Sequence, residues 1–196
     1  MRNSLQKRTW AEVSLDNISH NYRAIRAALP EGCRFLGVVK ADAYGHGAVA
    51  VARLLEKWGR ITAVGTTSVR TLESLTALAW RIRTAGTPDA ERVVGQWELY
   101  DVPAEFSGRE ALETLLKYMD EKGLERIKAA TQIMITPLGY EFRIVRNIVT
   151  NFHQPKSTLL LLVSAFVGGD WKRIYEYALG HGFRFLSYGD SSVLMR

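Results

Sequence analysis

Short apolar runs alternate with amphipathic stretches in this chain of 196 residues, and this alternation constrains the fold more than any other feature. The run at 61–65 is typical of a short strand, and the run at 34–40 is typical of a buried one. A helical stretch at about 48–58 follows the run at 34–40. The helical stretch that follows the run at 61–65 carries apolar residues at helical spacing, namely Val69, Leu72, Leu75, Leu78 and Ile82. Strands that alternate with helices form layered folds. We therefore predict the α/β class.

Local signals predict the bounds of the elements nearer the N-terminus. Residues 10–15 alternate in the manner of a strand, and Asp16 is a suitable N-cap for the helix that follows. Residues 30–32 (Pro-Glu-Gly) end that helix. Residues 84–106 lack a clean period, which predicts a loop around a short strand at 93–99.

Further signals predict the C-terminal elements. The segment 107–110 has the spacing of a capping box, so a helix is expected from there to about Lys122, with Gly123 just beyond its end. The apolar run at 159–167 is either a buried strand or a short core helix. Strands are also predicted at 131–136, 140–150 and 183–188, and a helix at 170–179.

Composition and charge limit the class of protein. The single cysteine, Cys33, excludes an internal disulfide framework and favours a reducing compartment. No apolar run approaches the roughly 20 residues of a membrane-spanning helix, and no secretory signal is visible. We expect a cytoplasmic protein with no membrane partner. A net charge of +6 is compatible with RNA contact but does not require it.

The stretch VVKADAYGHG holds the first candidate chemical site. Lys40 ends an apolar strand, where its amine can project into a pocket and form a Schiff base with a carbonyl cofactor. Tyr44 and the neighbouring glycines suit a phosphate group. The alternative is a solvated lysine before a turn.

Residues 8–58, within a predicted N-terminal segment 1–58, resemble the N-terminus of alanine racemase, in the opening WAEVSLDNISHNY and in VVKADAYGHG. The resemblance implies that Lys40 binds pyridoxal phosphate and is one of two racemising bases, and that Tyr44 contacts the cofactor phosphate. It also implies the first units of a TIM-type (β/α)₈ barrel, which needs about 250 residues. Nothing after Trp58 continues that barrel, and the second base has no counterpart.

A second candidate site begins at AVGTTSVR. Gly65, Thr66, Thr67 and Ser68 stand between a strand and a helix, where free N–H groups and hydroxyls suit an anion. Arg70 can add a bidentate clamp. The alternative is a plain helix cap at Thr67 or Ser68.

Two later turns carry further polar residues. Asn151 and His153 lie in VTNFHQPKST, and Tyr188 and Asp190 lie in SYGD. A histidine can act as acid or base near neutral pH. The alternative for each turn is a purely structural role.

Residues 60–194, within a predicted C-terminal segment 59–196, resemble the C-terminal part of the S-adenosylmethionine:tRNA ribosyltransferase-isomerase family of queuosine biosynthesis. The resemblance rests on RITAVGTTSVRTLES, TQIMITPLGYEFRIVRNIVTNFHQPKSTLLLLVSAFVG and YALGHGFRFLSYGDSSVL. Leu138 is an insertion relative to the family's usual Pro-Gly-aromatic run, which could shift Tyr140. The family's N-terminal half has no counterpart.

This second resemblance implies a reaction without a metal. A base removes a proton beside the sulfonium of S-adenosylmethionine, and the ribosyl unit passes to a 7-deazaguanine base at the tRNA wobble position. It implies substrate binding by Gly65–Ser68, Arg70 and Asn151, and a catalytic group of His153, Asp190 and Tyr188, with His153 the first choice of base. Arg143, Arg146 and Lys156 are candidate RNA phosphate contacts, with a solvated strand face as the alternative.

The two resemblances leave three hypotheses for the chain. It is a fragment or variant of the ribosyltransferase-isomerase with a barrel-like α/β core, a pyridoxal-phosphate protein that acts through Lys40, or a non-catalytic fusion of segments 1–58 and 59–196. The sequence leaves its oligomeric state open.

Overall fold

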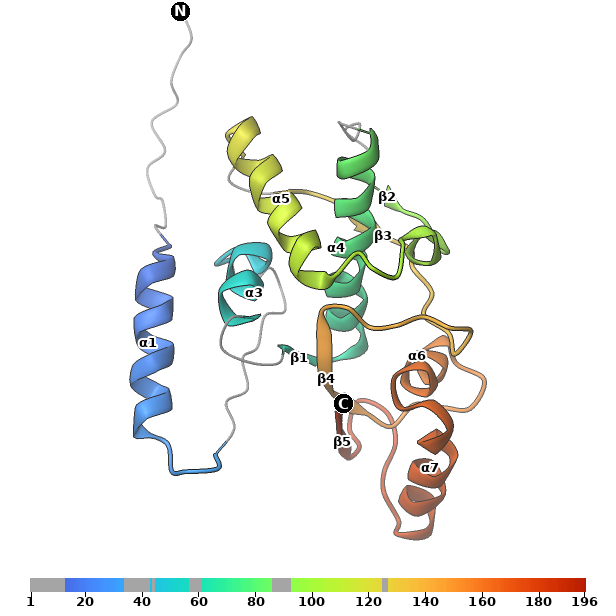
Figure 1. Ribbon diagram of the computed structural model, residues 1–196. Coiled ribbons are helices and arrows are strands. Elements are labelled where there is room, and N and C mark those ends of the chain that lie inside the picture. Colours follow the sequence, from blue (N-terminus) through green and yellow to red (C-terminus); the bar gives the residue numbers. More distant parts are fainter. Residues whose placement is uncertain (1–12, 34–42, 44, 57–60, 86–92, 125–126) are drawn as a thin grey trace, which may run out of the picture. The chain divides into compact units, whose positions relative to one another are not determined.

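The computed structural model describes residues 13–33, 43, 45–56, 61–85, 93–124 and 127–196 (Figure 1). The chain divides into two compact units, Met1–Phe35 and Leu36–Arg196. In the first unit the described element is helix α1, Leu15–Ala28. The predicted N-cap at Asp16 is wrong, because Ser14 caps α1 by accepting the Asn17 N–H at 3.2 Å. Asp16 lies instead in the first turn, where its charge favours the positive end of the helix dipole.

The second unit has a mixed α/β architecture. Its helices are α3 (Ala48–Glu56), α4 (Thr66–Ala85), α5 (Gly108–Lys122), α6 (Thr158–Val167) and α7 (Trp171–Gly180), with the 3₁₀ turns η1 (Glu98–Asp101) and η2 (Gly168–Asp170). Its strands are β1 (Ile61–Val64), β2 (Val93–Val94), β3 (Ala130–Thr131), β4 (Val145–Asn151) and β5 (Ser191–Met195).

The strands form two small open sheets. In the larger sheet the order is β1-β4-β5, with β1 parallel and β5 antiparallel to β4. The smaller sheet pairs β2 with β3 in parallel. Within the described residues neither sheet closes into a barrel. No described helix is long and apolar enough to cross a membrane.

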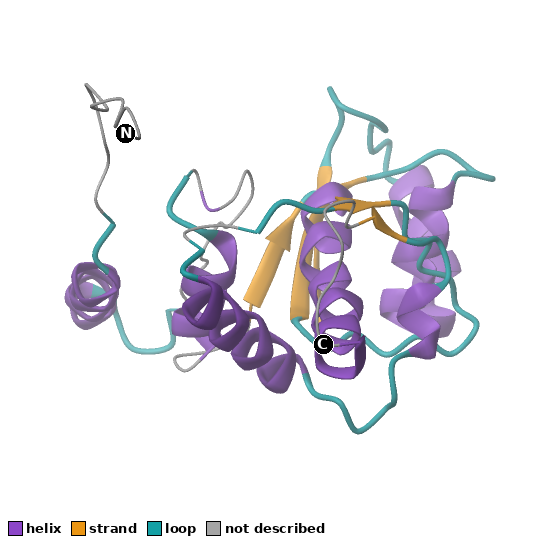
Figure 2. Cartoon of the chain, turned by 90° about the horizontal axis from the view of Figure 1, so that it is seen from above, coloured by secondary structure: helices purple, strands orange, loops and turns teal. Residues whose placement is uncertain are grey.

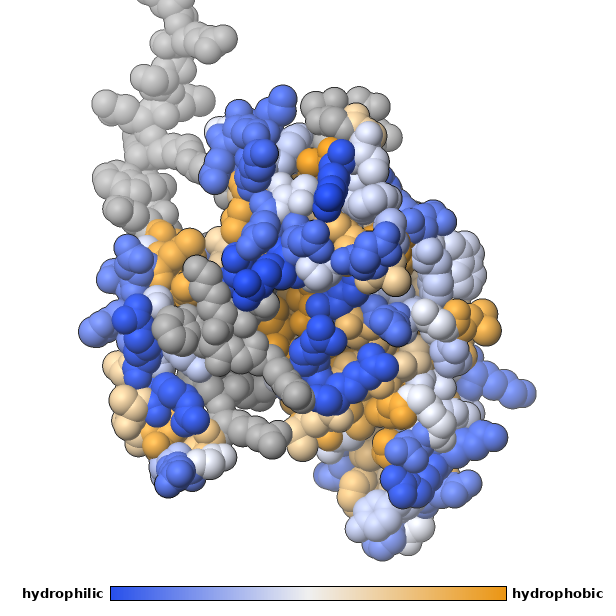
Figure 3. Space-filling view, in the orientation of Figure 1, coloured by the Kyte–Doolittle hydropathy of each residue, from blue (hydrophilic) through white to orange (hydrophobic). Residues whose placement is uncertain are grey.

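Helix α4 is the centre of the second unit. Val69, Leu72, Leu78 and Ile82 are buried, as their spacing predicts. Figures 1 and 2 show α4 beside the larger sheet, with α3 and α5 on one side and α6 and α7 on the other. Aromatic pairs connect the last two helices to the ends of β4, with ring centroids 4.9 Å apart for Phe142–Phe166 and 5.4 Å apart for Phe152–Tyr175. Hydrophilic side chains cover the outer faces of α5 and α7 (Figure 3).

The signals for α5 are confirmed at both ends. Ser107 and Glu110 form a complete capping box, and Gly123 ends the helix in the left-handed region at φ 59°. The apolar run at 159–167 forms the core helix α6 and not a strand. The predicted helix at 170–179 corresponds to α7.

Four predicted strands are wrong in their bounds or their existence. Of the strand expected at 131–136, only Thr131 belongs to a strand, as the last residue of β3, and β2 stops at Val94 before η1. The strand expected at 140–150 begins only at Val145, because the N–H groups of residues 143–145 donate to a side chain of α4. Residues 183–188 form a loop, with Leu186 at φ 67°, and the strand follows at β5.

Helix α3 belongs to the second unit and packs against α5, where Arg53 donates to Glu113. The start of α3 follows a tight turn in which Gly45 and Gly47 both have φ of 85°. The domain boundary predicted at residues 58/59 stays a prediction. The strand expected at 34–40 and most of the one at 10–15 lie outside the described residues.

Candidate functional site

The carboxyl ends of β1 and β4 lie side by side, and the start of β5 lies next to the end of β4. Val64 is in register with Val149, and the Gly65 N–H donates to the Val149 carbonyl at 2.8 Å. On the other side of β4, Asn151 is in register with Ser191. Segments from residues 65, 151 and 191 therefore share one edge of the sheet, which we call the carboxyl edge (Figure 1).

Helix α4 starts at the carboxyl edge. Gly65 makes the turn from β1 at φ 85°, a conformation that other residues rarely adopt. The Val69 N–H donates to the Gly65 carbonyl, so the N–H groups of Thr66, Thr67 and Ser68 precede the first helical hydrogen bond. Thr66 is buried and Thr67 is exposed. The positive end of a 20-residue helix thus faces this edge.

The cap predicted at Thr67 or Ser68 is wrong, because both residues lie inside the first turn of α4. The Ser68 hydroxyl donates backward to the Val64 carbonyl at 2.8 Å. Two residues on, the Nε of Arg70 is buried and has no hydrogen-bond partner within the part of the chain that the structure describes. A buried N–H without a partner is costly, which favours a ligand for this guanidinium.

Asn151 joins three segments at the carboxyl edge. Its Nδ2 donates to the Leu186 carbonyl at 2.9 Å, and its Oδ1 accepts from the Ser191 hydroxyl at 2.8 Å. Both ends of the amide are therefore occupied. Asn151 holds the loop after α7 against the end of β4.

His153 is buried just beyond β4. Its Nε2 lies 3.0 Å from the Thr150 hydroxyl, and its backbone N–H donates to the Tyr175 hydroxyl at 3.0 Å. Burial lowers the pKa of the His153 imidazole from its ordinary value. The imidazole is therefore neutral at pH 7, which is the form that can accept a proton.

Asp190 and Tyr188 lie in the loop before β5. The Asp190 carboxylate accepts the Arg184 N–H at 2.8 Å, and the Asp190 N–H donates to the Arg184 carbonyl at 2.8 Å. Asp190 thus closes the loop. Tyr188 is 96% exposed and projects into solvent, so the structure does not bring its phenol together with His153.

Glu73 is the functional-site candidate that the pattern analysis missed. It is fully buried on α4, and its carboxylate accepts from the Tyr140 hydroxyl at 2.5 Å and from the Val145 N–H at 2.7 Å. The N–H groups of Arg143 and Ile144 donate to it at 3.1 Å each. The available signal was its position four residues after Val69, on the buried helical face.

Burial shifts the pKa of both the Glu73 carboxyl and the Tyr140 phenol that donates to it. Burial raises the pKa of the Glu73 carboxyl, and the hydrogen bonds from Tyr140 and the backbone oppose this rise. Burial and the adjacent Glu73 raise the pKa of the Tyr140 phenol, which therefore keeps its proton. Leu138 is 79% exposed in the preceding turn, so its side chain lies outside the core while Tyr140 reaches Glu73.

The candidate RNA-binding cations lie in different surroundings. Arg143 donates to the Val102 carbonyl at 2.7 Å, and Arg146 donates to the Phe142 carbonyl at 3.1 Å. Lys156 is exposed in the turn after β4 at φ 60°. Lys40 and Tyr44 lie outside the described residues.

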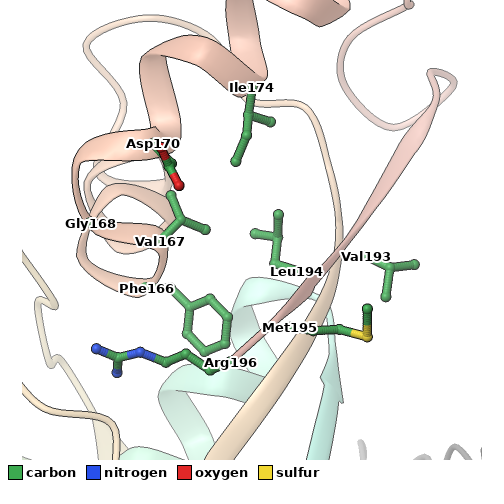
Figure 4. Close-up of a pocket in the computed structure, with 9 residues that line it drawn as sticks. All are labelled: Phe166, Val167, Gly168, Asp170, Ile174, Val193, Leu194, Met195 and Arg196. Carbon is green, nitrogen blue, oxygen red and sulfur yellow. The ribbon is translucent and has the colours of Figure 1, made fainter.

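A hollow of about 390 Å³ lies elsewhere, between β5 and helices α6 and α7 (Figure 4). Phe166 of α6, Ile174 of α7 and Leu194 of β5 are among the residues that line it. In β5, Leu194 pairs with Ile148 of β4, whereas Asn151 pairs with Ser191. None of the described residues that line the hollow is a predicted site residue. The described residues also contain no cluster of three or more metal-binding side chains.

The comparison with protein families covers the whole carboxyl edge. Residues 45–194 match the family model described as "Queuosine biosynthesis protein". This chain belongs to that family. The match includes α3, Gly65–Arg70, His153 and Asp190, and so spans both sides of the Gly59 junction.

Curated members of the queuosine biosynthesis family give the extent of the similarity. An S-adenosylmethionine:tRNA ribosyltransferase-isomerase of Burkholderia ambifaria is 52% identical over 89 residues, which is 44% of this chain and 25% of that protein. Its Burkholderia mallei counterpart is 39% identical over 147 residues, which cover 74% of this chain and 30% of that protein. The chain thus spans between a quarter and a third of the length of these relatives.

A solved structure is also similar. The S-adenosylmethionine tRNA ribosyltransferase of Thermotoga maritima is 31% identical and matches with a TM-score of 0.46, over 74% of this chain and 36% of that one.

Proposed function

We propose that this chain carries part of the S-adenosylmethionine site of a tRNA ribosyltransferase-isomerase of queuosine biosynthesis. The reaction transfers the ribosyl unit of S-adenosylmethionine to a 7-deazaguanine base at the tRNA wobble position and isomerises it, and adenine and methionine leave. The family match and the names of the relatives support this reaction. A cytoplasmic location, where tRNA is modified, and a barrel-like core in the full-length enzyme belong to the same proposal.

The observation that carries the proposal is the meeting of distant segments at the carboxyl edge. The start of α4, the end of β4 and the loop before β5 are far apart in sequence, and hydrogen bonds connect all three. Ligands of α/β proteins bind at the carboxyl ends of parallel strands. This placement supports the proposal that Gly65–Ser68 and Arg70 bind the substrate, while Asn151 contributes by holding the edge together through its two hydrogen bonds.

The chemistry of the edge suits the methionine part of S-adenosylmethionine. That part ends in a carboxylate, and the N–H groups of Thr66–Ser68 at the positive end of α4 bind an anion. Arg70 adds a cation whose Nε lacks a partner within the described residues. We therefore assign the carboxylate to the start of α4.

His153 is the proposed base. It needs a neutral imidazole to take the proton beside the sulfonium, and burial keeps it neutral at pH 7. If the Nε2–H of His153 donates to the Thr150 hydroxyl, Nδ1 carries no proton and its lone pair can accept one. Asp190 acts on this site through the backbone of the loop that it closes.

Calorimetric titration tests the carboxylate assignment. Wild type and Arg70→Gln are each titrated with S-adenosylmethionine and with 5′-methylthioadenosine, which lacks the carboxylate. Because a charge-assisted hydrogen bond contributes about 1.5–3 kcal/mol, Arg70→Gln is expected to weaken S-adenosylmethionine binding at least tenfold. Binding of 5′-methylthioadenosine should not change. An equal loss for both ligands, or no loss for either, would contradict the assignment.

Turnover by the chain alone is expected to be weak or absent, because the chain spans at most about a third of the length of its relatives. Adenine release from S-adenosylmethionine in the presence of precursor tRNA measures this directly. A rate comparable to that of a full-length relative would contradict the expectation. A folded chain that binds no substrate would support the third hypothesis, a non-catalytic fusion.

The motif at Lys40 supports a second proposal, that the N-terminal segment binds pyridoxal phosphate as alanine racemase does. It rests on the sequence VVKADAYGHG alone. Borohydride should then trap the cofactor on wild type and not on Lys40→Ala. Equal labelling of the two proteins would contradict it.

A further inference from the structure

We propose that Tyr188 is a stacking platform for an unpaired base of the RNA substrate. This inference rests on the proposed function for the class of partner and adds the surface that receives it. Tyr188 lies in the segment 183–190, which we call the aromatic loop. Its ring is 96% exposed, and exposed Phe183 and Leu186 flank it in the same loop.

The backbone that carries Tyr188 is fixed. Arg184 and Asp190 exchange hydrogen bonds across the loop, each at 2.8 Å. The Leu186 N–H donates to the Phe152 carbonyl at 3.0 Å, and the Leu186 carbonyl accepts from Asn151 at 2.9 Å. Below the loop, the Phe185 ring packs 5.6 Å from that of Phe152. The exposure of Tyr188 is therefore imposed by an anchored loop, which reduces the entropy that binding would cost.

The residue after Tyr188 supports the same conclusion. A Cβ added at Gly189 would lie 2.2 Å from the Arg184 carbonyl oxygen, so the loop closes too tightly there for any other residue. The geometry presents the Tyr188 ring outward from this tight turn.

Aromatic and basic side chains continue from the loop onto α7, with Tyr177 and His181 near its end and Arg173 in its first turn. Tyr177 is 58% exposed and stacks on His181 with ring centroids 3.8 Å apart. Arg184 and Arg173 are mostly exposed, and their contacts with Asp190 (3.7 Å) and Asp170 (3.4 Å) are surface ion pairs that contribute little. Exposed rings beside exposed cations are the kind of surface that single-stranded nucleic acid binds, because every base has a stacking face.

The placement of the aromatic loop relates it to the proposed reaction. Asn151 and Phe152 hold the loop, and both lie directly before His153. An unpaired base on Tyr188 is therefore bound to the same segment that forms the carboxyl edge. Such a contact suits a loop nucleotide, because sequence-specific recognition of RNA mostly uses unstacked bases that stack on aromatic side chains.

The test measures RNA binding by the full chain. Fluorescence anisotropy follows binding of a labelled anticodon stem-loop hairpin and of a blunt duplex with the same stem. Stacking on one aromatic ring contributes enough that Tyr188→Ala should weaken hairpin binding between about fivefold and a hundredfold. Binding of the duplex should not change.

Three further proteins make the outcome specific. Tyr188→Phe and Tyr188→Trp should bind the hairpin as wild type does, since each keeps a ring. Trp97→Ala removes an exposed aromatic residue beside η1 and should leave hairpin binding unchanged. A loss in Tyr188→Phe equal to that in Tyr188→Ala would assign the effect to the phenol hydroxyl and overturn stacking.

Two further outcomes would overturn the stacking proposal. Wild-type affinity in Tyr188→Ala, or a change in its sedimentation that shows self-association through the loop, overturns the proposal. Titration of wild type with S-adenosylmethionine separates the two claims. Ring-dependent hairpin binding without S-adenosylmethionine binding would uphold the platform while the proposed function fails.

Discussion

At the scale of single residues, Glu73 is the side chain on which the carboxyl edge depends most. It is buried on α4, where its carboxylate accepts hydrogen bonds from the Tyr140 hydroxyl and from the backbone N–H groups of the segment that enters β4. The same β4 carries Asn151 to the edge and His153 just beyond it. Glu73 therefore fixes where these residues lie, although it is not at the edge itself.

We predict that Glu73→Gln lowers the free energy of unfolding by about 2–4 kcal/mol. The amide keeps the volume, but it presents N–H groups to backbone N–H donors and leaves them unsatisfied in the core. Urea unfolding followed by circular dichroism measures the change. Glu113→Gln is the matched control, since its carboxylate is half-exposed beside Arg53 and should cost less than about 1 kcal/mol. Equal losses in the two variants would refute this role of Glu73.

His153 is expected to make stability depend on pH. Burial depresses its pKa in the folded state, so below about pH 6.5 the unfolded chain binds a proton that the folded chain does not. Stability should therefore fall as the pH falls from about 7 towards the folded pKa, and this part of the slope should be absent in His153→Asn. His181→Asn, which replaces an exposed histidine at the end of α7, is the control variant and should keep this part of the slope. Identical slopes in wild type and His153→Asn would contradict the prediction.

At the scale of elements, α5 meets the segment before β4 at Gly108. In an ordinary helix Gly→Ala stabilises by about 0.5–1 kcal/mol. A Cβ at Gly108, however, would lie 2.4 Å from the Arg143 carbonyl oxygen, whereas one at Gly180 of α7 would meet nothing within 4 Å. Gly108→Ala should thus destabilise by about 1–3 kcal/mol, and Gly180→Ala should not. Thermal unfolding of both variants tests this, and a stabilised Gly108→Ala would be the contrary result.

The elements that the sequence predicts well are those with local signals. The bounds of α5 follow from Ser107, Glu110 and Gly123, all of which act within one turn of the helix ends. The bounds of β4 do not, because Glu73, some 70 residues earlier, takes the N–H groups that a longer strand would use. The aromatic loop was predicted as a strand for the same reason, since Asp190 and Asn151 hold it through contacts that no periodicity records.

The candidate site likewise has features that adjacent residues predict and features that only the fold determines. The motif at Gly65–Arg70 predicts an anion-binding helix start, because a strand, a glycine and hydroxyl residues are adjacent in sequence. Its proximity to Asn151 depends on the parallel register of β1 and β4, which only the structure gives. Tyr188 was grouped with His153 by sequence, and the structure separates their environments.

At the scale of the whole molecule, the family match begins at residue 45, and α3 packs on α5 within the second unit, Leu36–Arg196. The central claim is that the carboxyl edge of this unit binds S-adenosylmethionine. The claim requires only folding of this unit and not turnover, so it can be tested on the chain as it stands.

The most direct test is thermal unfolding of the purified chain with increasing S-adenosylmethionine. A ligand that binds only the folded state stabilises it by about 2.7 kcal/mol at a hundredfold excess over Kd. We expect one cooperative transition whose midpoint rises with ligand concentration, and a smaller rise in Arg70→Gln. A cooperative transition that S-adenosylmethionine does not move would contradict the claim.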